Sequence, residues 1–224
     1  MHLRPVTRDD LSSIADIASE AYRDDSLQRI FFPPKAVENG SQRRKSMLRI
    51  RKRLVEASTR CIVSVSDEKD EFWSGKPELL GYANWTRVGK SEAANNWQID
   101  SLLSKLERTL ITAEMWYTET FLDRDLPWDK IHHVRTLTAN SFGSIPEYFE
   151  LAGLAVRPKF HRRGIGGMML KYGIDLAQEE QIPVLLQASA VGTRLYTKFG
   201  FQEIRKTEVF PEVIAVAMQL DPKD

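Results

Sequence analysis

Hydrophobic and polar positions alternate along the chain in a way that predicts strands and helices in turn. Short apolar or alternating runs predict strands at residues 2–4, 60–66, 79–88, 151–156, 183–189 and 213–220. Apolar residues at helical spacing predict helices over residues 11–23, over 41–55 with Ser41 as the cap, and over 168–180. Residues 31–34 are expected to form a loop with two exposed phenylalanines, and residues 67–78 a charged loop. These elements predict one α/β domain that spans residues 1–224.

Composition and charge are those of an ordinary globular protein and argue against several classes. Hydrophobic residues make up 42% of the chain and charged residues 28%, and the net charge of +1 disfavours a dedicated nucleic-acid binder. No apolar run approaches the ~20 residues that span a bilayer, and the first ten residues do not resemble a secretory signal. The single cysteine, Cys61, excludes an internal disulfide and suits a reducing compartment. We therefore expect a cytoplasmic protein, or a cytoplasmic and nuclear one, with no membrane partner.

One stretch, residues 151–170, combines a strand, a tight turn and the start of a helix. The strand is expected to end at Pro158, which cannot donate a hydrogen bond to a sheet. The turn is crowded with arginines and glycines, at Arg162, Arg163, Gly164, Gly166 and Gly167. Unpaired N–H groups at the start of a helix attract phosphate, because the positive end of the helix dipole lies behind them. The turn is thus predicted to bind a phosphate or a pyrophosphate.

Two common phosphate motifs do not match this turn, and a third is similar to it. A P-loop requires lysine after its glycines, which Gly166-Gly167 lack, and a dinucleotide fingerprint fails at Met169. Residues 161–166, preceded by Val-Arg-Pro at 156–158, resemble motif A of the Gcn5-related N-acetyltransferases (GNAT), written Gln/Arg-x-x-Gly-x-Gly/Ala. His161 departs from that motif, because the family usually has glutamine or arginine there. The resemblance implies that backbone amides of the turn hold the pyrophosphate of acetyl-coenzyme A.

A second signature of the same family follows in the expected order. Residues 192–201 contain Leu-Tyr-x-x-x-Gly-Phe, in which Gly200 is well placed to end a short helix. The two signatures cover about residues 148–204, and the first half of the chain matches the family only in the order of its elements. The resemblance implies the GNAT fold, a mixed and mostly antiparallel sheet of about seven strands, splayed at the fourth strand and flanked by helices. It also implies an acyltransferase with acetyl-coenzyme A as co-substrate.

The main departure from the family is a segment of about sixty residues before the fourth strand, residues 91–147. The family usually has a short hairpin connection there, and a structureless loop of this length is uncommon. Helical spacing predicts one long or two shorter amphipathic helices, on the evidence of Ile99, Leu102, Leu103, Leu106 and Leu110. Their apolar face is expected to pack on the sheet or to act as a lid that shapes the acceptor pocket, and both roles can hold together.

The resemblance also implies roles for individual residues. Glu150 matches the glutamate that acts as general base in the histone acetyltransferase branch, with Glu147 as a weaker substitute. Tyr196 matches the family's usual general acid, a phenol near the coenzyme sulfur. Coenzyme contacts are implied for Leu154, Ala155, Val156, Arg162, Arg163, Gly164, Ile165, Gly166, Gly167 and Ser189. At Ser189 many relatives have asparagine, so this position also departs from the family.

Most of these residues also have an ordinary structural interpretation, which stays open at this point. Glu150 can be a strand-end carboxylate or an ion-pair partner, and Tyr196 can be a packing tyrosine. The basic residues between 43 and 53 are interpreted as a solvated helix face. The tryptophans are assigned to core packing, at Trp85, Trp97, Trp116 and Trp128. No metal site is expected, because the histidine pair at 132–133 has no cysteine or carboxylate at ligand spacing.

The sequence therefore predicts an N-acetyltransferase that moves an acetyl group from acetyl-coenzyme A directly to a primary amine. The acceptor is a small molecule or a peptide, and the protein is a monomer or a homodimer. Two rival hypotheses remain. One is a non-catalytic sensor or scaffold that binds acyl-coenzyme A with the same fold, and the other is a protein that binds a nucleotide without acyl transfer.

Overall fold

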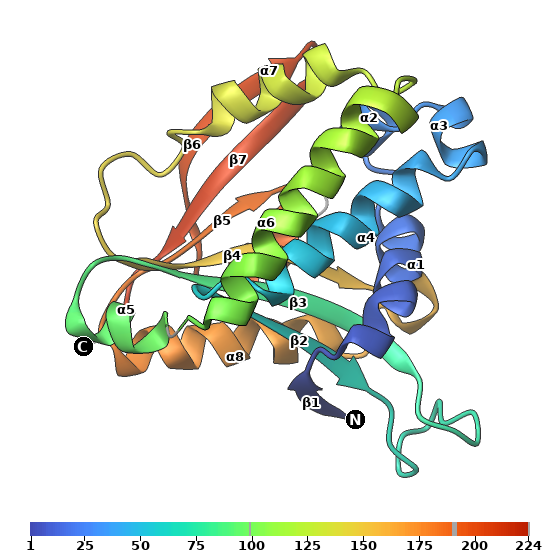
Figure 1. The fold of residues 1–224 in the computed structure, drawn as a ribbon. Coiled ribbons are helices and arrows are strands. Elements are labelled where there is room, and N and C mark those ends of the chain that lie inside the picture. Colours follow the sequence, from blue (N-terminus) through green and yellow to red (C-terminus); the bar gives the residue numbers. More distant parts are fainter. Residues whose placement is uncertain (99, 190–191, 224) are drawn as a thin grey trace.

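The computed structural model describes residues 1–98, 100–189 and 192–223 and shows a mixed α/β fold (Figure 1). Within these residues the strands form one seven-stranded sheet in the order β1-β2-β3-β4-β5-β7-β6. Neighbouring strands are antiparallel except β4 and β5, which are parallel. The predicted fold class is therefore confirmed. The strands are β1 (His2–Pro5), β2 (Thr59–Val65), β3 (Leu79–Val88), β4 (Tyr148–Val156), β5 (Val184–Ala188), β6 (Gln202–Phe210) and β7 (Val213–Leu220).

Helices cover both faces of the sheet. On one face, α1 (Leu11–Ala21) and α4 (Ser41–Leu54) pack on a cluster that includes Val63 of β2. On the other face, α8 (Ile165–Glu179) packs on the larger cluster, which includes Ile62 of the same strand. Successive residues of a strand point to opposite faces, so the two clusters lie on opposite sides of the sheet. In the part of the chain that the structure describes, no helix has the length and apolar character needed to cross a bilayer.

Two predictions about the first helices are wrong. The loop predicted at residues 31–34 is reduced to Phe32 and Pro33, which connect α2 (Ser26–Phe31) and α3 (Pro34–Glu38). Phe31 and Phe32 are partly buried there, because they pack against a cluster that the distant residues 126 and 131 complete. The cap of α4 is Gly40 at φ 79°, and Ser41 is fully buried as the first residue of the helix. A left-handed turn between α3 and α4 favours glycine, which removes the need for a serine cap.

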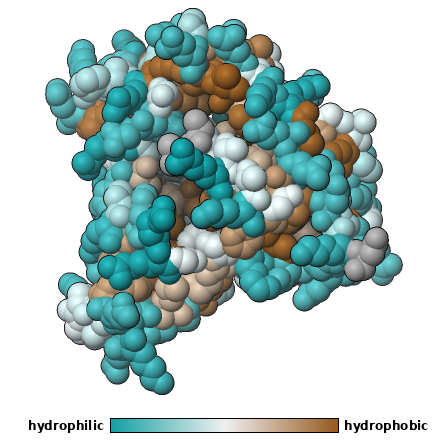
Figure 2. Space-filling view, turned by 180° about the vertical axis from the view of Figure 1, so that it is seen from behind, coloured by the Kyte–Doolittle hydropathy of each residue, from teal (hydrophilic) through white to brown (hydrophobic). Residues whose placement is uncertain are grey.

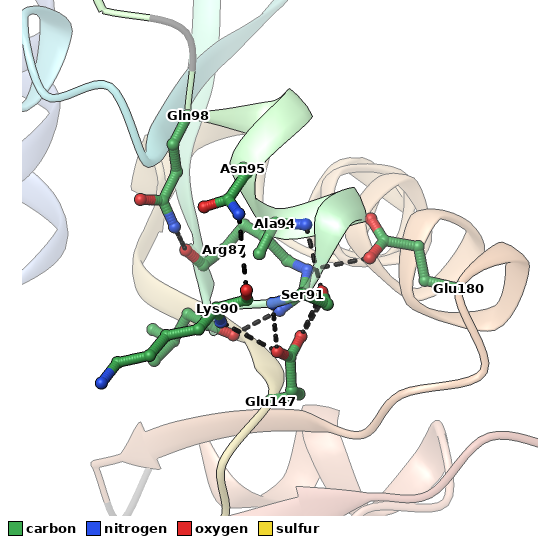
Figure 3. A network of polar contacts seen from close by, with 9 residues as sticks. Arg87, Lys90, Ser91, Ala94, Asn95, Gln98, Glu147 and Glu180 are labelled. Atoms are coloured by element: carbon green, nitrogen blue, oxygen red, sulfur yellow. Dashed lines mark hydrogen bonds and ion pairs between the residues drawn. The ribbon is translucent and has the colours of Figure 1, made fainter.

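The segment between β3 and β4 is helical, as predicted, but its described residues hold three helices. They are α5 (Glu92–Trp97), α6 (Leu102–Tyr117) and α7 (Trp128–Thr138), with the π-helical turn η2 (Thr118–Leu122) after α6. The carboxylate of Glu147, at the end of the segment, accepts hydrogen bonds from the backbone N–H groups of Lys90 (2.9 Å) and Ser91 (2.8 Å) at its start (Figure 3). Buried Arg87 bonds to the same carboxylate and to Glu180 at the end of α8 (2.9 Å). The two ends of the segment are therefore joined at one point on the sheet.

The prediction that the apolar face of this segment packs on the sheet is wrong for α6. α6 lies on the outer side of α4 (Figure 1), and Ile111 is its one buried residue. The four leucines that predicted the helix, Leu102, Leu103, Leu106 and Leu110, are all exposed. Ile99, the fifth residue of that pattern, lies outside the described residues. The lid role stays a prediction.

Strand β6 has no counterpart among the predicted strands. It forms a hairpin with β7 and lies at the edge of the sheet, and its residues from Gln202 to Lys206 are exposed. The exposed first half of this edge strand needs no alternation of apolar and polar residues. The periodicity that identified the other strands is therefore absent from this one.

Candidate active site

β4 and β5 separate halfway along β4, which opens a wedge at the centre of the sheet. β5 pairs with β4 only at residues 149–151, and from Gly153 onward β4 pairs with β3 alone. β5 pairs with β7 along its whole length, and its Gln187 and Ala188 pair with β7 alone. A bulge in β4 opposite Trp85 bends the strand where the wedge begins. Seen from behind, the molecular surface is hollowed near its middle, with hydrophobic residues in its depth and hydrophilic residues around its rim (Figure 2).

The open edge of β4 presents the backbone of Leu154 and Val156 to this wedge. The N–H of Arg157 bonds to the carbonyl of Leu80 on β3 (2.8 Å). Backbone groups alternate between the two neighbours of a strand, so those of Ala155 also face β3 and those of Leu154 and Val156 face away from it. Of the three strand residues predicted to contact the coenzyme, two lie on the open edge, and Ala155 turns its backbone to β3.

Side chains already occupy the carbonyl oxygens along this edge. The three hydrogen bonds run from Arg53 Nη2 to Ala152 O (2.9 Å), from the Tyr22 hydroxyl to Leu154 O (2.7 Å) and from His161 Nε2 to Val156 O (2.9 Å). A carbonyl can only accept, so His161 must carry its proton on Nε2. With its carbonyls paired, the edge offers N–H donors. Such an edge suits a ligand that brings carbonyl oxygens, as amides and thioesters do.

The turn predicted to bind phosphate lies at the end of the same strand. Gly164 caps α8 at φ 78°, and no side chain accepts from the first-turn N–H groups of the helix. Arg162 is also left-handed, at φ 65°, a conformation that costs a non-glycine residue roughly 1–3 kcal/mol and therefore needs support from its surroundings. A β-carbon at Gly166 would lie 3.7 Å from the Leu154 side chain and 3.8 Å from that of Val156. The turn and the open edge are therefore in direct contact.

Charged side chains flank this turn at the surface. Arg162 and Arg163 are exposed, and the guanidinium of Arg163 lies 4.9 Å from the centroid of the Phe72 ring. Stacking on an aromatic ring restrains a guanidinium while leaving its N–H groups available to an anion. His161, the departure from the motif, holds the turn against the end of β4 through its bond to Val156. Uncapped amides and two arginines together suit a pyrophosphate.

Tyr196 lies on α9 (Thr193–Lys198) with its ring in the main core. The ring is 8% exposed and packs edge-on against Phe201, with 5.9 Å between centroids. Burial raises the pKa of the Tyr196 phenol to about 12, so the hydroxyl is protonated at neutral pH. Burial also raises the pKa of Tyr22, and repulsion from ionised Tyr82 and Tyr196 raises it further. The hydroxyl of Tyr22 donates to the carbonyl of Leu154 on the open edge of β4.

Glu150 is half-buried on β4, two residues before Ala152. Burial raises the pKa of its carboxyl above the ordinary value, and the positive charge of Arg53 opposes that rise. Arg53 projects from α4 and donates to the carbonyl of Ala152, two residues after Glu150, at the bulge where the wedge begins. A carboxylate whose pKa is raised toward neutrality is better suited to accept a proton at physiological pH.

Three residues around the wedge were not among the predicted site residues. They are Tyr22 from the end of α1, Arg53 from the end of α4 and Asn84 from β3. Asn84 is 2% exposed, and its Nδ2 has no hydrogen-bond partner in the structure. A β-carbon at Gly153 would lie 3.2 Å from Arg53 Nη1 and 3.4 Å from Asn84 Nδ2. The one sequence signal was the basic run of α4, because nothing in the spacing of Tyr22 or Asn84 distinguishes them from structural residues.

Two predicted residues have clear structural partners. The Arg87 guanidinium holds the pKa of Glu147 at about 2, which makes this carboxylate an ion-pair partner and a poor base (Figure 3). The hydroxyl oxygen of Ser189 accepts a hydrogen bond from the backbone N–H of Gly192 (3.3 Å), which joins the end of β5 to the turn before α9. The contact of Ser189 with the coenzyme stays a prediction.

Comparison with known proteins agrees with this geometry. Residues 131–203 match the model of the acetyltransferase (GNAT) domain. An uncharacterized N-acetyltransferase of Schizosaccharomyces pombe is 21% identical over 214 residues, which cover 94% of this chain and 84% of that protein. The chain is also similar in fold to a histone acetyltransferase HPA2-related protein from Corynebacterium glutamicum, with a TM-score of 0.63, 16% identity and coverage of 99% and 96% of the two chains.

A further solved structure is that of the PaiA N-acetyltransferase from Thermoplasma acidophilum in complex with coenzyme A. The TM-score with this chain is 0.56, at 12% identity over 98% of each chain. At this identity the likeness concerns the fold. The match to the family model over residues 131–203, the two signatures in the sequence and the splayed sheet show that this chain contains a GNAT acetyltransferase domain, and they support an acyltransferase.

Proposed function

We propose that this protein transfers an acetyl group from acetyl-coenzyme A directly to a primary amine. The observation that carries the proposal is the open edge of β4, whose carbonyls at residues 152, 154 and 156 are already bonded and whose N–H groups face the wedge. The uncapped start of α8 touches the same edge at Gly166. A pantetheine arm along this edge would place its pyrophosphate at α8 and its thioester near Leu154.

Glu150 is the proposed general base. An alkylamine with a pKa of ~10.4 is neutral about once in a thousand molecules at pH 7, a deficit of about 4–5 kcal/mol. The raised pKa of Glu150 brings it closer to the working pH, and its place at the bulge puts it beside the thioester end of the wedge. It can take the proton of the amine directly or through water.

Tyr196 and Leu154 are proposed to act on the leaving group and on the developing negative charge. The Tyr196 phenol, protonated at neutral pH, can deliver its proton to the departing thiolate. The N–H of Leu154 faces the wedge and can donate to the oxygen of the thioester carbonyl, a contact worth about 3 kcal/mol in the transition state. The hydrogen bond from Tyr22 to the carbonyl of the same residue fixes the orientation of this part of the strand.

Direct transfer is supported by the state of Cys61. Burial raises the pKa of this thiol to about 11, so almost no thiolate is present at neutral pH. Cys61 lies on β2, two strands away from the open edge of β4. A covalent acyl-enzyme on Cys61 would need a thiolate at this residue and a path for the acetyl group from the open edge of β4 to β2. The fold provides neither.

The acceptor side of the site carries positive charge. Arg53 and Arg49 belong to α4, and repulsion from Arg49, together with burial, lowers the pKa of Arg53. Neither forms an ion pair with a carboxylate among the described residues, whereas Arg43, Arg44 and Arg51 on the same helix do. Their charge would repel a polycationic amine. The proposed acceptor therefore carries neutral or anionic groups beside its amine.

The test begins with a mass-spectrometric screen of amines, grouped by net charge, in the presence of acetyl-coenzyme A. With an acceptor in hand, Glu150→Gln is expected to lower kcat by about 10²–10⁴-fold and to leave the Kd for coenzyme A unchanged. Tyr196→Phe is expected to lower kcat by a smaller factor. Glu203→Gln on exposed β6 and Tyr172→Phe on α8 are the matched controls and should retain full turnover.

Three results would contradict this proposal. A wild-type protein that binds coenzyme A and acetylates no amine would favour the sensor or scaffold. Tight binding of ATP in place of coenzyme A in a thermal-shift assay would favour a nucleotide-binding protein. Turnover that is unchanged by Glu150→Gln would remove this residue from the mechanism.

A further inference from the structure

The outer side of α6 and η2 carries a continuous run of large apolar side chains in solvent, here called the α6 stripe. Its members are exposed to between 46% and 85%, and they are Leu102, Leu103, Leu106, Leu110, Trp116, Tyr117, Phe121 and Leu122. Residues 103, 106, 110, 113 and 117 follow one another at steps of three and four, the spacing of a helix seam that packs against another helix. Scattered exposed leucines are common, whereas a row of eight large apolar residues is not.

Polar contacts on the inner side hold α6 in this orientation. Glu107 pairs with Arg8 at 2.6 Å, and Glu114 pairs with Arg51 of α4 at 2.9 Å. Arg108 bonds to the carbonyl of Val55 at the end of α4. A surface helix normally turns its apolar side to the protein and its charged side to water. α6 does the opposite. Its charged residues contact α4 and the 3-10 turn η1 (Arg8–Asp10), and the α6 stripe faces outward.

The size of the stripe matches one half of a stable interface. At about 200 Å² for each large apolar side chain, the exposed parts of its eight members add up to on the order of 900 Å². The largest apolar patch on a typical monomer is about 300–600 Å². A standard protein interface buries about 800 Å² on each partner. The stripe is therefore too large for an ordinary monomer surface and large enough for a dimer.

We propose that the α6 stripe is the interface of a homodimer, in which α6 of one protomer packs antiparallel against α6 of its partner. A two-fold axis near residues 110–113 would set Leu103 and Leu106 of one protomer against Phe121 and Tyr117 of the other, and Leu110 against the small Ala113. The stripe itself has no charged member, and between its apolar residues Thr109 and Thr112 are exposed. A neutral apolar surface is complementary to itself, so a second copy of this chain needs no charge of opposite sign.

This interface would be independent of the wedge, because its residues take no part in the coenzyme or acceptor site. It would, however, stiffen the site indirectly. α6 rests on α4, and α4 carries Arg53 to the bulge in β4. The dimer would thus restrain α6 and, through it, α4.

The test measures mass in solution by sedimentation velocity at micromolar concentration. The native chain is expected to be a dimer. The double variant Leu106→Glu/Leu110→Glu is expected to be a monomer, with the Kd of dimerisation raised at least ~100-fold, because two buried charges would face an apolar partner. Both leucines are exposed in the protomer, so its circular dichroism and its affinity for coenzyme A should stay unchanged. Val37→Glu is the matched control, since Val37 is 49% exposed on α3 and lies outside the stripe; it should remain a dimer.

A cross-linking experiment checks the arrangement of the two copies. Cys61 is buried, so Ala113→Cys introduces a single exposed thiol near the expected axis. A short bismaleimide is expected to link two copies of this variant and to leave Val37→Cys unlinked. A native chain that sediments as a monomer would overturn the proposal, and so would a dimer that survives Leu106→Glu/Leu110→Glu. A monomer that floats with vesicles of phosphatidylcholine and phosphatidylserine would overturn it as well, because the stripe would then face a lipid surface.

Discussion

Replacing Gly173 by alanine would test how tightly α8 is packed on the sheet, and so how firmly the proposed phosphate turn is held. A β-carbon at Gly173 would come closer than 3.0 Å to ring carbons of Trp85, whereas carbon atoms rest about 3.5–4.0 Å apart. Trp85 is fully buried, so its ring cannot move aside into solvent. Either α8 or the β3 side of the core must therefore shift.

The cost of Gly173→Ala follows from three contributions. Overpacking of a dense core costs about 1–3 kcal/mol. The indole N–H of Trp85 donates to the carbonyl of Met169 on the same helix (3.3 Å), and losing that bond as the ring moves costs about 1 kcal/mol. Alanine in place of glycine inside a helix returns about 0.5–1 kcal/mol. The expected net loss in the free energy of unfolding is about 1–3.5 kcal/mol, or roughly 2–14 °C in Tm for a chain of this size.

Chemical denaturation, followed by tryptophan fluorescence and by circular dichroism, measures this loss. Gly166→Ala is the matched control on the same helix, because its β-carbon would find its nearest neighbour at 3.4 Å, an ordinary contact. Its stability should be unchanged or slightly higher. In a Trp85→Leu background the same Gly173→Ala change should cost at least 1 kcal/mol less, since the clashing ring is gone. Equal costs in the two backgrounds, or no cost in either, would refute the argument.

Three further changes test the site and its support. Arg53→Met removes the charge that lowers the pKa of Glu150, so the acid limb of the kcat/KM profile should move to higher pH. A move to lower pH would contradict the assignment of Glu150 as the general base. Arg53→Lys keeps the charge and should keep the native profile. Tyr22→Phe removes the bond to Leu154, and the KM for acetyl-coenzyme A should rise about fivefold, the equivalent of about 1 kcal/mol, without loss of folding. Glu147→Gln should lower the free energy of unfolding by roughly 2 kcal/mol at pH 7. The pKa of Glu147 is about 2 in the folded protein and 4.5 ordinarily, so its contribution to stability is complete above pH 4.5 and disappears as the pH falls to about 2. Urea unfolding measures the free energy of unfolding of the native chain and of Glu147→Gln across this range. A difference between the two that stays constant would contradict the ion-pair account.

Local patterns in the sequence were enough to predict the strands and helices that have one buried apolar side and one exposed polar side. Residues 79–88 and 151–156 are apolar enough to require burial, and Pro158 ends β4 whatever surrounds it. The turn after β4 was equally clear, because glycine at φ 78° before a helix has few alternatives. β6 was missed for the converse reason: an exposed edge strand carries no periodicity to detect.

The acceptor side of the site could not be predicted in the same way. Glu150 and Tyr196 were named by their resemblance to a family motif, yet their pKa values depend on burial that only the packed core creates. Arg53 belongs to a basic run in which nothing along the helix separates it from its neighbours. It reaches β4 because α4 ends above a bulge, a contact between residues that lie 99 positions apart.

The insertion shows the same division most clearly. The spacing of its leucines determined that α6 would be a helix with one apolar side, since helix formation depends on residues three and four apart. Which way that side points is visible only in the folded chain, where Ile111 is buried and the glutamates of α6 pair with Arg8 and Arg51, residues that lie far away in the sequence. The sequence by itself thus determined the strands and helices with one apolar side, and the turn between β4 and α8, because these depend on local geometry. The tertiary structure alone decided the open edge of β4, the partners of Glu150 and the outward stripe of α6, because each of these depends on which distant segments come together.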